Sequence, residues 1–186
     1  ADPPLRPRQV MNGKLVASLR AGRLPFRVAL SPDRKRLYVT NVGMFEYKPV
    51  PGADRKRARE TGLPFPAYGF PSEEAMKGAK RETGEGAVDV PPLGDPNVPE
   101  SNSLCILDVS DPANGRVVTF VRTGEPVGPL STGGSSPSGL AVSADSIYVS
   151  NANQDTITVI DAASSQVRAT IPLRVPGLEK YRGILP

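Results

Sequence analysis

Short apolar runs alternate with clusters of turn-forming residues along much of the chain. Near the C-terminus four such runs follow one another, and they read GLAVS, SIYVSN, TITVID and VRATIPL between residues 139 and 173. The breaks between them, such as SAD and DAASSQ, are rich in Ser and Asp, whose side chains hydrogen-bond nearby backbone in tight turns. The pattern predicts four short antiparallel strands joined as a meander.

The same pattern occurs twice. The stretch GRLPFRVALSPDRKRLYVTN, which starts at Gly22, aligns with SSPSGLAVSADSIYVSN, so that Tyr38 corresponds to Tyr148. The stretch SLCILDVSDPANGRVVTFV, which starts at Ser103, aligns with TITVIDAASSQVRATIPL. Each copy therefore contains four strand-like runs, and we expect two equivalent four-stranded sheets.

The character of the runs predicts how the sheets are covered. The inner runs are apolar at nearly every residue and need cover on both faces, whereas the fourth run alternates, with Val167, Ala169 and Ile171 around Arg168 and Thr170. Four-stranded sheets stacked around a central axis satisfy both conditions. We therefore predict an all-β fold of β-propeller blades, a partial propeller with a long insertion between two strands.

The repeat assigns each part of the chain a place in a row of blades. Two blades cannot close a ring, and open sheet edges favour association, so we expect further blades from the same protein or from neighbouring chains. The expected segments are residues 1–12 as a flexible leader, 13–22 as the outer strand of a preceding blade, 23–124 as a blade with an insertion at 42–102, 125–173 as a second blade, and 174–186 as the lead into a further blade.

Two features of the sequence resemble a known family. ALSPD followed by LYVTN, and IYVSNANQDTITVID, resemble the YVTN-type β-propeller repeat. VPGLEKYRGILP and the insertion ETGLPFPAYGFPSEEA resemble a bacterial branch in which an alkaline-phosphatase-like phosphoesterase domain follows the propeller in the same polypeptide. The resemblance implies a phosphoesterase domain as a partner. Together with the start at Ala1, it implies a periplasmic or secreted protein.

Composition excludes several classes of function. The 23 Lys and Arg against 19 Asp and Glu give a charge of +4, too little for a strong attraction to nucleic acid. No apolar run is long enough to span a membrane. The sequence has no His, which excludes a Ser-His pair and a haem-ligating His within this chain. Cys105 is expected to be a small buried hydrophobe, and no cofactor is expected.

The insertion carries the candidate contact residues. A basic cluster in ADRKRARE indicates either an anion contact or a solvated loop, since the insertion as a whole has 8 basic and 10 acidic residues. An aromatic group in LPFPAYGFP either anchors the insertion onto its own propeller or forms a contact for another domain, and its prolines reduce the entropy lost on docking. These candidates are Arg55, Lys56, Arg57 and Arg59 in the first group, and Phe65, Tyr68 and Phe70 in the second.

The rest of the insertion predicts a short surface helix and a turn-rich return. Ser72 is a suitable N-cap, and the acids that follow it precede the bases, which predicts a helix over about residues 72–82. In VDVPPLGDPNVPE the oxygen-bearing side chains of Asp89, Asp95, Asn97 and Glu100 can in principle hold Ca²⁺, but the segment lacks the ordered spacing of a calcium loop. Turn formation explains these residues equally well, so no metal site is assigned.

These observations favour a non-catalytic scaffold or interaction segment that supports a phosphoesterase-type domain or another partner. The alternative is part of a propeller enzyme that binds a metal or small substrate near the central channel through residues outside this chain. A dry interface that buries Phe65 and Phe70 favours the first, and a ligand on the channel axis favours the second. Whether the parent protein is an enzyme stays open.

Overall fold

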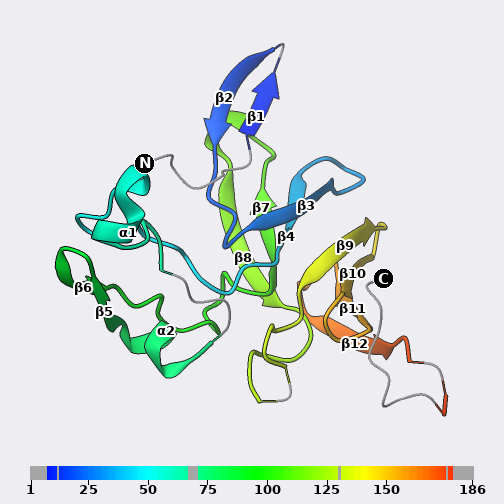
Figure 1. The fold of residues 1–186 in the computed structure, drawn as a ribbon. Helices are drawn as coiled ribbons and strands as arrows, with labels where there is room; N and C mark the ends of the chain where they lie inside the picture. Colours follow the sequence, from blue (N-terminus) through cyan, green and yellow to red (C-terminus); the bar gives the residue numbers. More distant parts are fainter. Residues whose placement is uncertain (1–7, 12, 67–70, 130, 175, 178–186) are drawn as a thin grey trace. The chain divides into compact units, whose positions relative to one another are not determined.

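The computed structural model describes residues 8–11, 13–66, 71–129, 131–174 and 176–177. The chain divides into two units, one made of residues 1–44 with 97–186 and the other of residues 45–96. The first unit contains the repeat and the second contains most of the insertion, so each is described by itself (Figure 1).

The first unit contains two four-stranded antiparallel sheets, which confirms the expected all-β fold of blade-like meanders. In each sheet the strands lie in chain order from one edge to the other, apart from the insertion between β4 and β7. The first sheet consists of β3 (Pro25–Leu30), β4 (Arg36–Asn41), β7 (Ser103–Asp108) and β8 (Arg116–Arg122). The second consists of β9 (Pro137–Val142), β10 (Ser146–Asn151), β11 (Thr156–Asp161) and β12 (Val167–Pro172).

The strands of the two copies of the repeat pair in the same way. Tyr38 of β4 lies opposite Ala29 and Ile106, and Tyr148 of β10 occupies the equivalent place in the second sheet. The Ser-Asp turns also coincide. Ser31 Oγ accepts a hydrogen bond from Arg36 N (2.9 Å), and Ser143 Oγ accepts one from Ser146 N (3.1 Å). Local sequence therefore specifies both the strands and the turns that join them.

The loop that leads into the inner strand is also repeated. Leu24 and Ser136, each just before a proline, have positive φ angles of 48° and 50°. In both loops the backbone oxygen of this residue accepts a hydrogen bond at 3.1 Å, from Val42 N in one and Ala152 N in the other. Two residues before Leu24, Gly22 lies against the buried side chain of Asn41, and its φ of +116° is one that glycine adopts readily.

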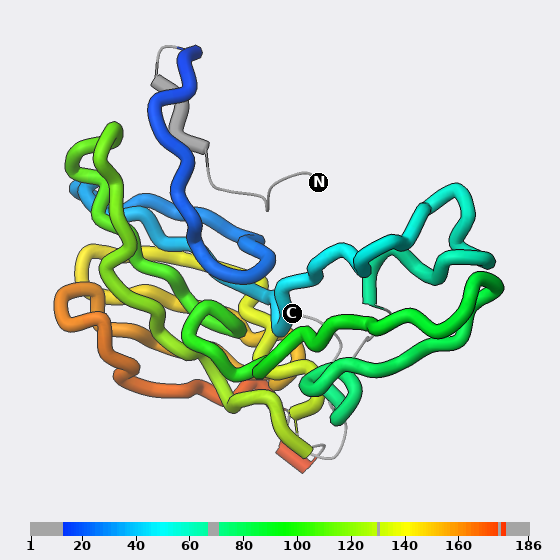
Figure 2. The backbone as a smooth tube through the Cα atoms, turned by 90° about the vertical axis from the view of Figure 1, so that its left-hand side faces the viewer, coloured from blue at the N-terminus to red at the C-terminus, as the bar shows by residue number. Residues whose placement is uncertain are grey.

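A single apolar core joins the two sheets, which lie side by side in Figures 1 and 2. The inner strand β9 of the second sheet lies against β3 and β4 of the first. The side chains of this core, here called the junction, come from facing sides of the two sheets. They are Tyr38, Leu104, Ile106 and Val121 from the first sheet, and Ile147, Val149 and Ile160 from the second.

The N-terminal segment differs from the expected flexible leader. Within residues 1–12, Arg8–Met11 form strand β1, which pairs antiparallel with β2 (Lys14–Ser18) as a hairpin. After this hairpin, Leu19 and Ala21 pack against the face of the first sheet that points away from the second sheet. This packing is compatible with residues 13–22 being the outer part of a preceding blade, which stays a prediction.

The insertion is a folded unit with helices and a hairpin of its own. It contains a 3₁₀ turn (Arg55–Arg57), α1 (Ala58–Thr61), α2 (Glu73–Lys77) and a hairpin of β5 (Ala79–Thr83) and β6 (Gly86–Val90). The predicted helix at residues 72–82 is correct only in its first half. Ser72 Oγ accepts a hydrogen bond from Ala75 N (3.0 Å) as the N-cap, but Gly78, with φ +86°, ends the helix. The following residues are strand β5.

Outside the insertion, the described residues contain one further helical segment, a short 3₁₀ turn (Pro112–Asn114) between β7 and β8. Among the described residues, no helix has both the length and the apolar character that crossing a membrane requires.

Candidate interaction surfaces

The second sheet exposes a face whose counterpart in the first sheet is buried. This face, here called the Tyr148 face, combines one exposed tyrosine with branched aliphatic side chains from the two outer strands. Tyr148 lies directly opposite Val159 across the β10–β11 pair, and Ile157 lies opposite Ile171 across the β11–β12 pair. Tyr148 is 41% exposed and Ile171 is 43% exposed.

The register assigns each of these residues a counterpart in the junction. Tyr148, Ile157, Val159 and Ile171 correspond to Tyr38, Leu104, Ile106 and Val121. All four counterparts are buried between the sheets. The Tyr148 face therefore has the side chains of a packed blade face without a sheet against it in the described structure.

The first sheet exposes apolar side chains on its opposite face. Val28 and Leu30 of β3 are 62% and 49% exposed, and they lie opposite Val39 and Leu37 of β4. Their counterparts in the second sheet are Leu140 and Val142 of β9, which pack against the junction. Val28 and Leu30, here called the β3 stripe, thus occupy positions that in the other copy contact a neighbouring sheet.

The outer part of the same face is covered by the chain itself. Val39, Leu107 and Val109 are buried in a second apolar cluster, to which Leu19 and Ala21 contribute from the segment after β2. On β3, by contrast, Val28 and Leu30 stay exposed.

The insertion unit has its own apolar cleft. Val50, Val88 and Val90 contribute to the lining of a volume of about 260 Å³, and Leu63 and Phe65 border it. Both Leu63 and Phe65 are more than half exposed. Phe65 is therefore available on the surface of its unit, whereas Tyr68 and Phe70, the other two aromatic candidates, lie outside the described residues.

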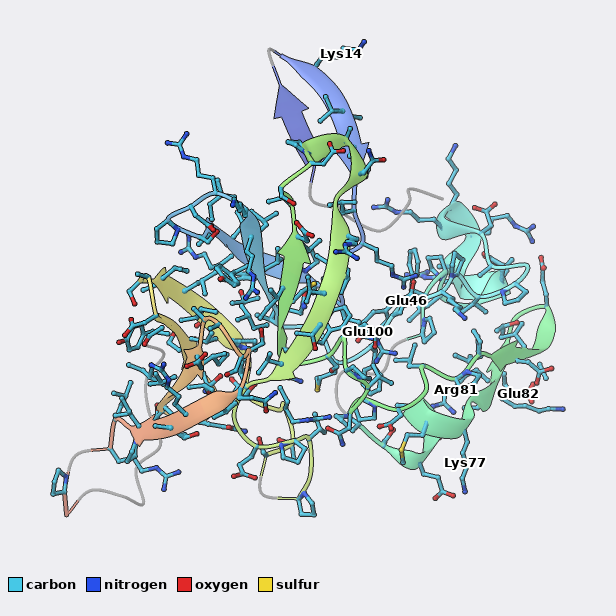
Figure 3. All side chains as sticks on the ribbon, turned by 180° about the vertical axis from the view of Figure 1, so that it is seen from behind. Lys14, Glu46, Lys77, Arg81, Glu82 and Glu100 are labelled. Atoms are coloured by element: carbon cyan, nitrogen blue, oxygen red, sulfur yellow. The ribbon has the colours of Figure 1, made fainter. Side chains whose placement is uncertain are left out.

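Charged side chains surround this cleft. Arg59 and Arg81 contribute to its lining, and Arg81 pairs with Glu74 of α2 at 2.5 Å. Figure 3 labels Arg81 with Glu82, its neighbour on β5, and Lys77 at the end of α2. An apolar cleft with a charged rim is typical of a surface that contacts another protein.

The four basic residues of the cluster lie close together in the chain, and one of them forms an ion pair within the insertion unit. Arg55, Lys56 and Arg57 form the 3₁₀ turn, and Arg59 follows in α1. Arg57 pairs with Glu85 in the β5–β6 turn, so one of the four positive charges is offset locally. Exposed ion pairs of this kind contribute little to stability, and the arrangement does not distinguish an anion contact from a solvated turn.

The oxygen-rich segment is not gathered into a metal site. Asn97, one of the four possible ligands, places its side-chain amide on the backbone of Val127: Nδ2 donates to Val127 O (3.0 Å), and Oδ1 accepts from Val127 N (2.9 Å). In the described part of the chain no group of three His, Cys, Asp or Glu is arranged to hold a metal ion. Nothing in the sequence signals the role of Asn97, because its partner lies 30 residues away.

The ionisable groups of the two sheets have structural roles. Burial raises the pKa of the Cys105 thiol to about 12, so this residue is a buried hydrophobe rather than a nucleophile.

The pKa values of Asp108 and Asp161 are lowered to about 2. For Asp108 the largest cause is the Ser110 hydroxyl (2.5 Å), and for Asp161 it is the backbone N–H of Ser164 (2.7 Å). Both carboxylates stabilise the turn between the third and fourth strands.

A hollow of about 560 Å³ beside β12 has several polar side chains in its lining, and some of these bond to groups of the protein. Gln154 donates to Glu125 O (3.0 Å) and to Ser131 Oγ (2.7 Å), and its Oε1 accepts from Glu125 N (2.8 Å). The guanidinium of Arg122 donates to Asn97 O (2.7 Å). These bonds tie two loops together, so the hollow is not an obvious ligand site.

The sequence matches no known family model. It likewise matches no curated protein. Among solved structures, the fold is similar to hydrazine synthase from Kuenenia stuttgartiensis, with a TM-score of 0.42 and 14% sequence identity. The similarity covers 86% of this chain and 40% of that chain, so this chain spans less than half of that protein. At this level the likeness does not bear on function, which has to be inferred from the surfaces.

Proposed function

We propose that this chain is a non-catalytic β-propeller scaffold of the YVTN-repeat type whose insertion unit binds a phosphoesterase-type domain. The observation that carries the proposal is the cleft of about 260 Å³ bordered by the exposed side chains of Leu63 and Phe65. The sequence resemblance supplies the kind of partner and a periplasmic or secreted location, and the repeat leads us to expect further blades from the same protein or from neighbouring chains.

The local sequence suits such a contact. Pro64 and Pro66 flank Phe65 and restrict the backbone before binding, which reduces the entropy lost when the aromatic ring docks. An aromatic side chain in an apolar pocket is the type of residue that dominates binding energy at protein interfaces. Leu63 and Phe65 are therefore expected to be the central contacts.

Lysine-directed cross-linking of the full-length gene product, read by mass spectrometry, tests the proposal. Cross-links from Lys56, Lys77 or Lys80 to a phosphoesterase-type domain are expected. The double substitution Leu63→Ser with Phe65→Ser should remove them.

The matched control is Val117→Ser with Val118→Ser, two exposed apolar residues of β8, which should leave the cross-links in place. Cross-links confined to residues 1–186, or cross-links that survive the cleft substitutions, would contradict the proposed docking. Hydrolysis of p-nitrophenyl phosphate by the 186-residue chain alone would contradict the non-catalytic role.

A further inference from the structure

We propose that copies of this chain associate head to tail, with the Tyr148 face of one copy packed on the β3 stripe of the next. The contact would bring together, between copies, the counterparts of the Tyr38 face and of the inner strand β9, which meet at the junction within each copy. The inference deepens the interaction role proposed above and rests on it, but it concerns a different surface from the cleft of the insertion unit.

The first step of the argument is chemical equivalence. The Tyr148 face presents Tyr, Ile, Val and Ile where the first sheet presents Tyr, Leu, Ile and Val to the junction. Its side chains therefore differ from those of an observed packed face only by exchanges among branched aliphatic residues. Such exchanges preserve volume well enough for similar packing.

The second step concerns the receiving surface. Within the chain, the inner strand β9 is the part of the second sheet that lies against β3 and β4. The equivalent strand of the first sheet is β3, and Val28 and Leu30 are the counterparts of its packed residues Leu140 and Val142. The stripe left uncovered by the β2 segment is thus the part that a neighbouring blade contacts most closely.

The third step is that the two surfaces are different patches at opposite ends of a two-sheet stack. Association through them is heterologous, so each copy has one surface of each kind and can bind two neighbours. A face-to-face dimer would instead use the same patch on both copies. This difference makes the two modes separable by experiment.

The polar part of the junction indicates that the association is weaker than the packing within a chain. Inside the chain, Arg36 donates from its guanidinium to the backbone oxygen of Ala162 (2.6 Å) across the two sheets. The residue equivalent to Arg36 in the second sheet is Ser146, whose hydroxyl already accepts from Arg168 (3.0 Å). The contact between copies therefore lacks a counterpart of this hydrogen bond.

Sedimentation velocity of the 186-residue chain from about 1 to 100 μM tests the proposal, and it is expected to show reversible growth beyond the monomer with concentration. Tyr148→Glu and Val28→Glu should each weaken the association at least about tenfold, because each places a charge in one of the two surfaces. Val118→Glu, at an exposed position of β8, is the matched control and should associate like the unchanged chain.

The decisive experiment mixes the two variants. The Val28→Glu copy keeps an intact Tyr148 face, and the Tyr148→Glu copy keeps an intact β3 stripe, so the mixture should form a 1:1 dimer that grows no further. Far-ultraviolet circular dichroism and a thermal melt establish whether each variant is folded. If a Glu variant is unfolded, Tyr148→Ser or Val28→Ser is used in its place.

A chain that stays monomeric over the whole range, variants that associate normally, or a mixture that stays monomeric would each overturn the proposal. A failure of this kind leaves the cross-linking result for Lys56, Lys77 and Lys80 unchanged, since that test reports on the insertion unit. The two proposals therefore fail separately.

Discussion

Tyr38 and Tyr148 occupy the same place in two copies of one repeat, yet Tyr38 is 1% exposed and Tyr148 is 41% exposed. The strand pairing around them is the same, and a Ser-Asp turn precedes the strand of each tyrosine. The difference arises from the neighbouring sheet, which covers one tyrosine and not the other. In a repeat fold, local sequence thus specifies the shape of each unit, while the stabilisation gained from an apolar face depends on the unit beside it.

The largest expected effect compares these two tyrosines directly. Tyr38→Ala should reduce the free energy of unfolding by about 3–5 kcal/mol, because it leaves a cavity in the junction between the sheets. Tyr148→Ala should cost less than about 1 kcal/mol when the chain is dilute, since the side chain is partly in water already. Urea unfolding followed by circular dichroism gives both values. Equal losses would show that the Tyr148 face is covered in solution even at low concentration.

A second pair of equivalent residues is expected to behave alike in the two copies. A Cβ on Gly22 would lie 2.5 Å from Asn41 Nδ2, and one on Gly134 would lie 2.4 Å from Asn102 Nδ2; both glycines have positive φ. Gly22→Ala and Gly134→Ala should each cost about 2–3 kcal/mol, from backbone strain and steric overlap with a buried amide. Gly13, with φ +76° and open space around it, is the control, and its replacement by Ala should cost only about 1 kcal/mol.

The two sheets and the insertion also differ in how far the sequence predicts them. The strands of both sheets follow from apolar runs, and the Ser-Asp turns at Ser31 and Ser143 follow from side chains that bond nearby backbone. In the insertion, no repeated pattern marks the hairpin of β5 and β6, and its strands are short and charged. The local signals in the insertion are Ser72, a typical N-cap, and Gly78, since a glycine after a short helical run is a frequent helix terminator.

The residues of the proposed contacts were predictable only in part. Aromatic residues near proline in the insertion identified Phe65, which the structure shows exposed beside an apolar cleft. Leu63 and the Tyr148 face were not identified, because exposure depends on residues that are distant in the sequence. The same is true of Asn97, which bonds to the backbone of Val127 through the fold of the loop and not through any local motif.

A smaller effect is expected at the Ser-Asp turns, where the two copies should again agree. Ser31 Oγ donates to Asp33 (2.6 Å) and Ser143 Oγ donates to Asp145 (2.8 Å) in the same geometry. Ser31→Ala and Ser143→Ala should each reduce the free energy of unfolding by about 1 kcal/mol, the usual net contribution of a hydrogen bond. A much larger loss at Ser31, measured by urea unfolding, would show that its greater burial changes the role of the turn.

The smallest expected effect separates Asp108 from Asp161 by their dependence on pH. Because both folded-state pKa values, about 2, lie below the ordinary value of 3.8, both carboxylates favour the folded state above pH 4, and this stabilisation is lost as the pH falls from 4 toward 2. Asp108→Asn and Asp161→Asn should each make stability less dependent on pH in that window.

The largest cause of the lowered pKa differs between the two residues: it is a hydroxyl hydrogen bond for Asp108 and a backbone N–H hydrogen bond for Asp161. Ser110→Ala should therefore raise the pKa of Asp108 more than Ser164→Ala raises that of Asp161, as carboxyl ¹³C chemical shifts during acid titration would report. Equal shifts would mean that the turns of the two copies hold their carboxylates in the same way.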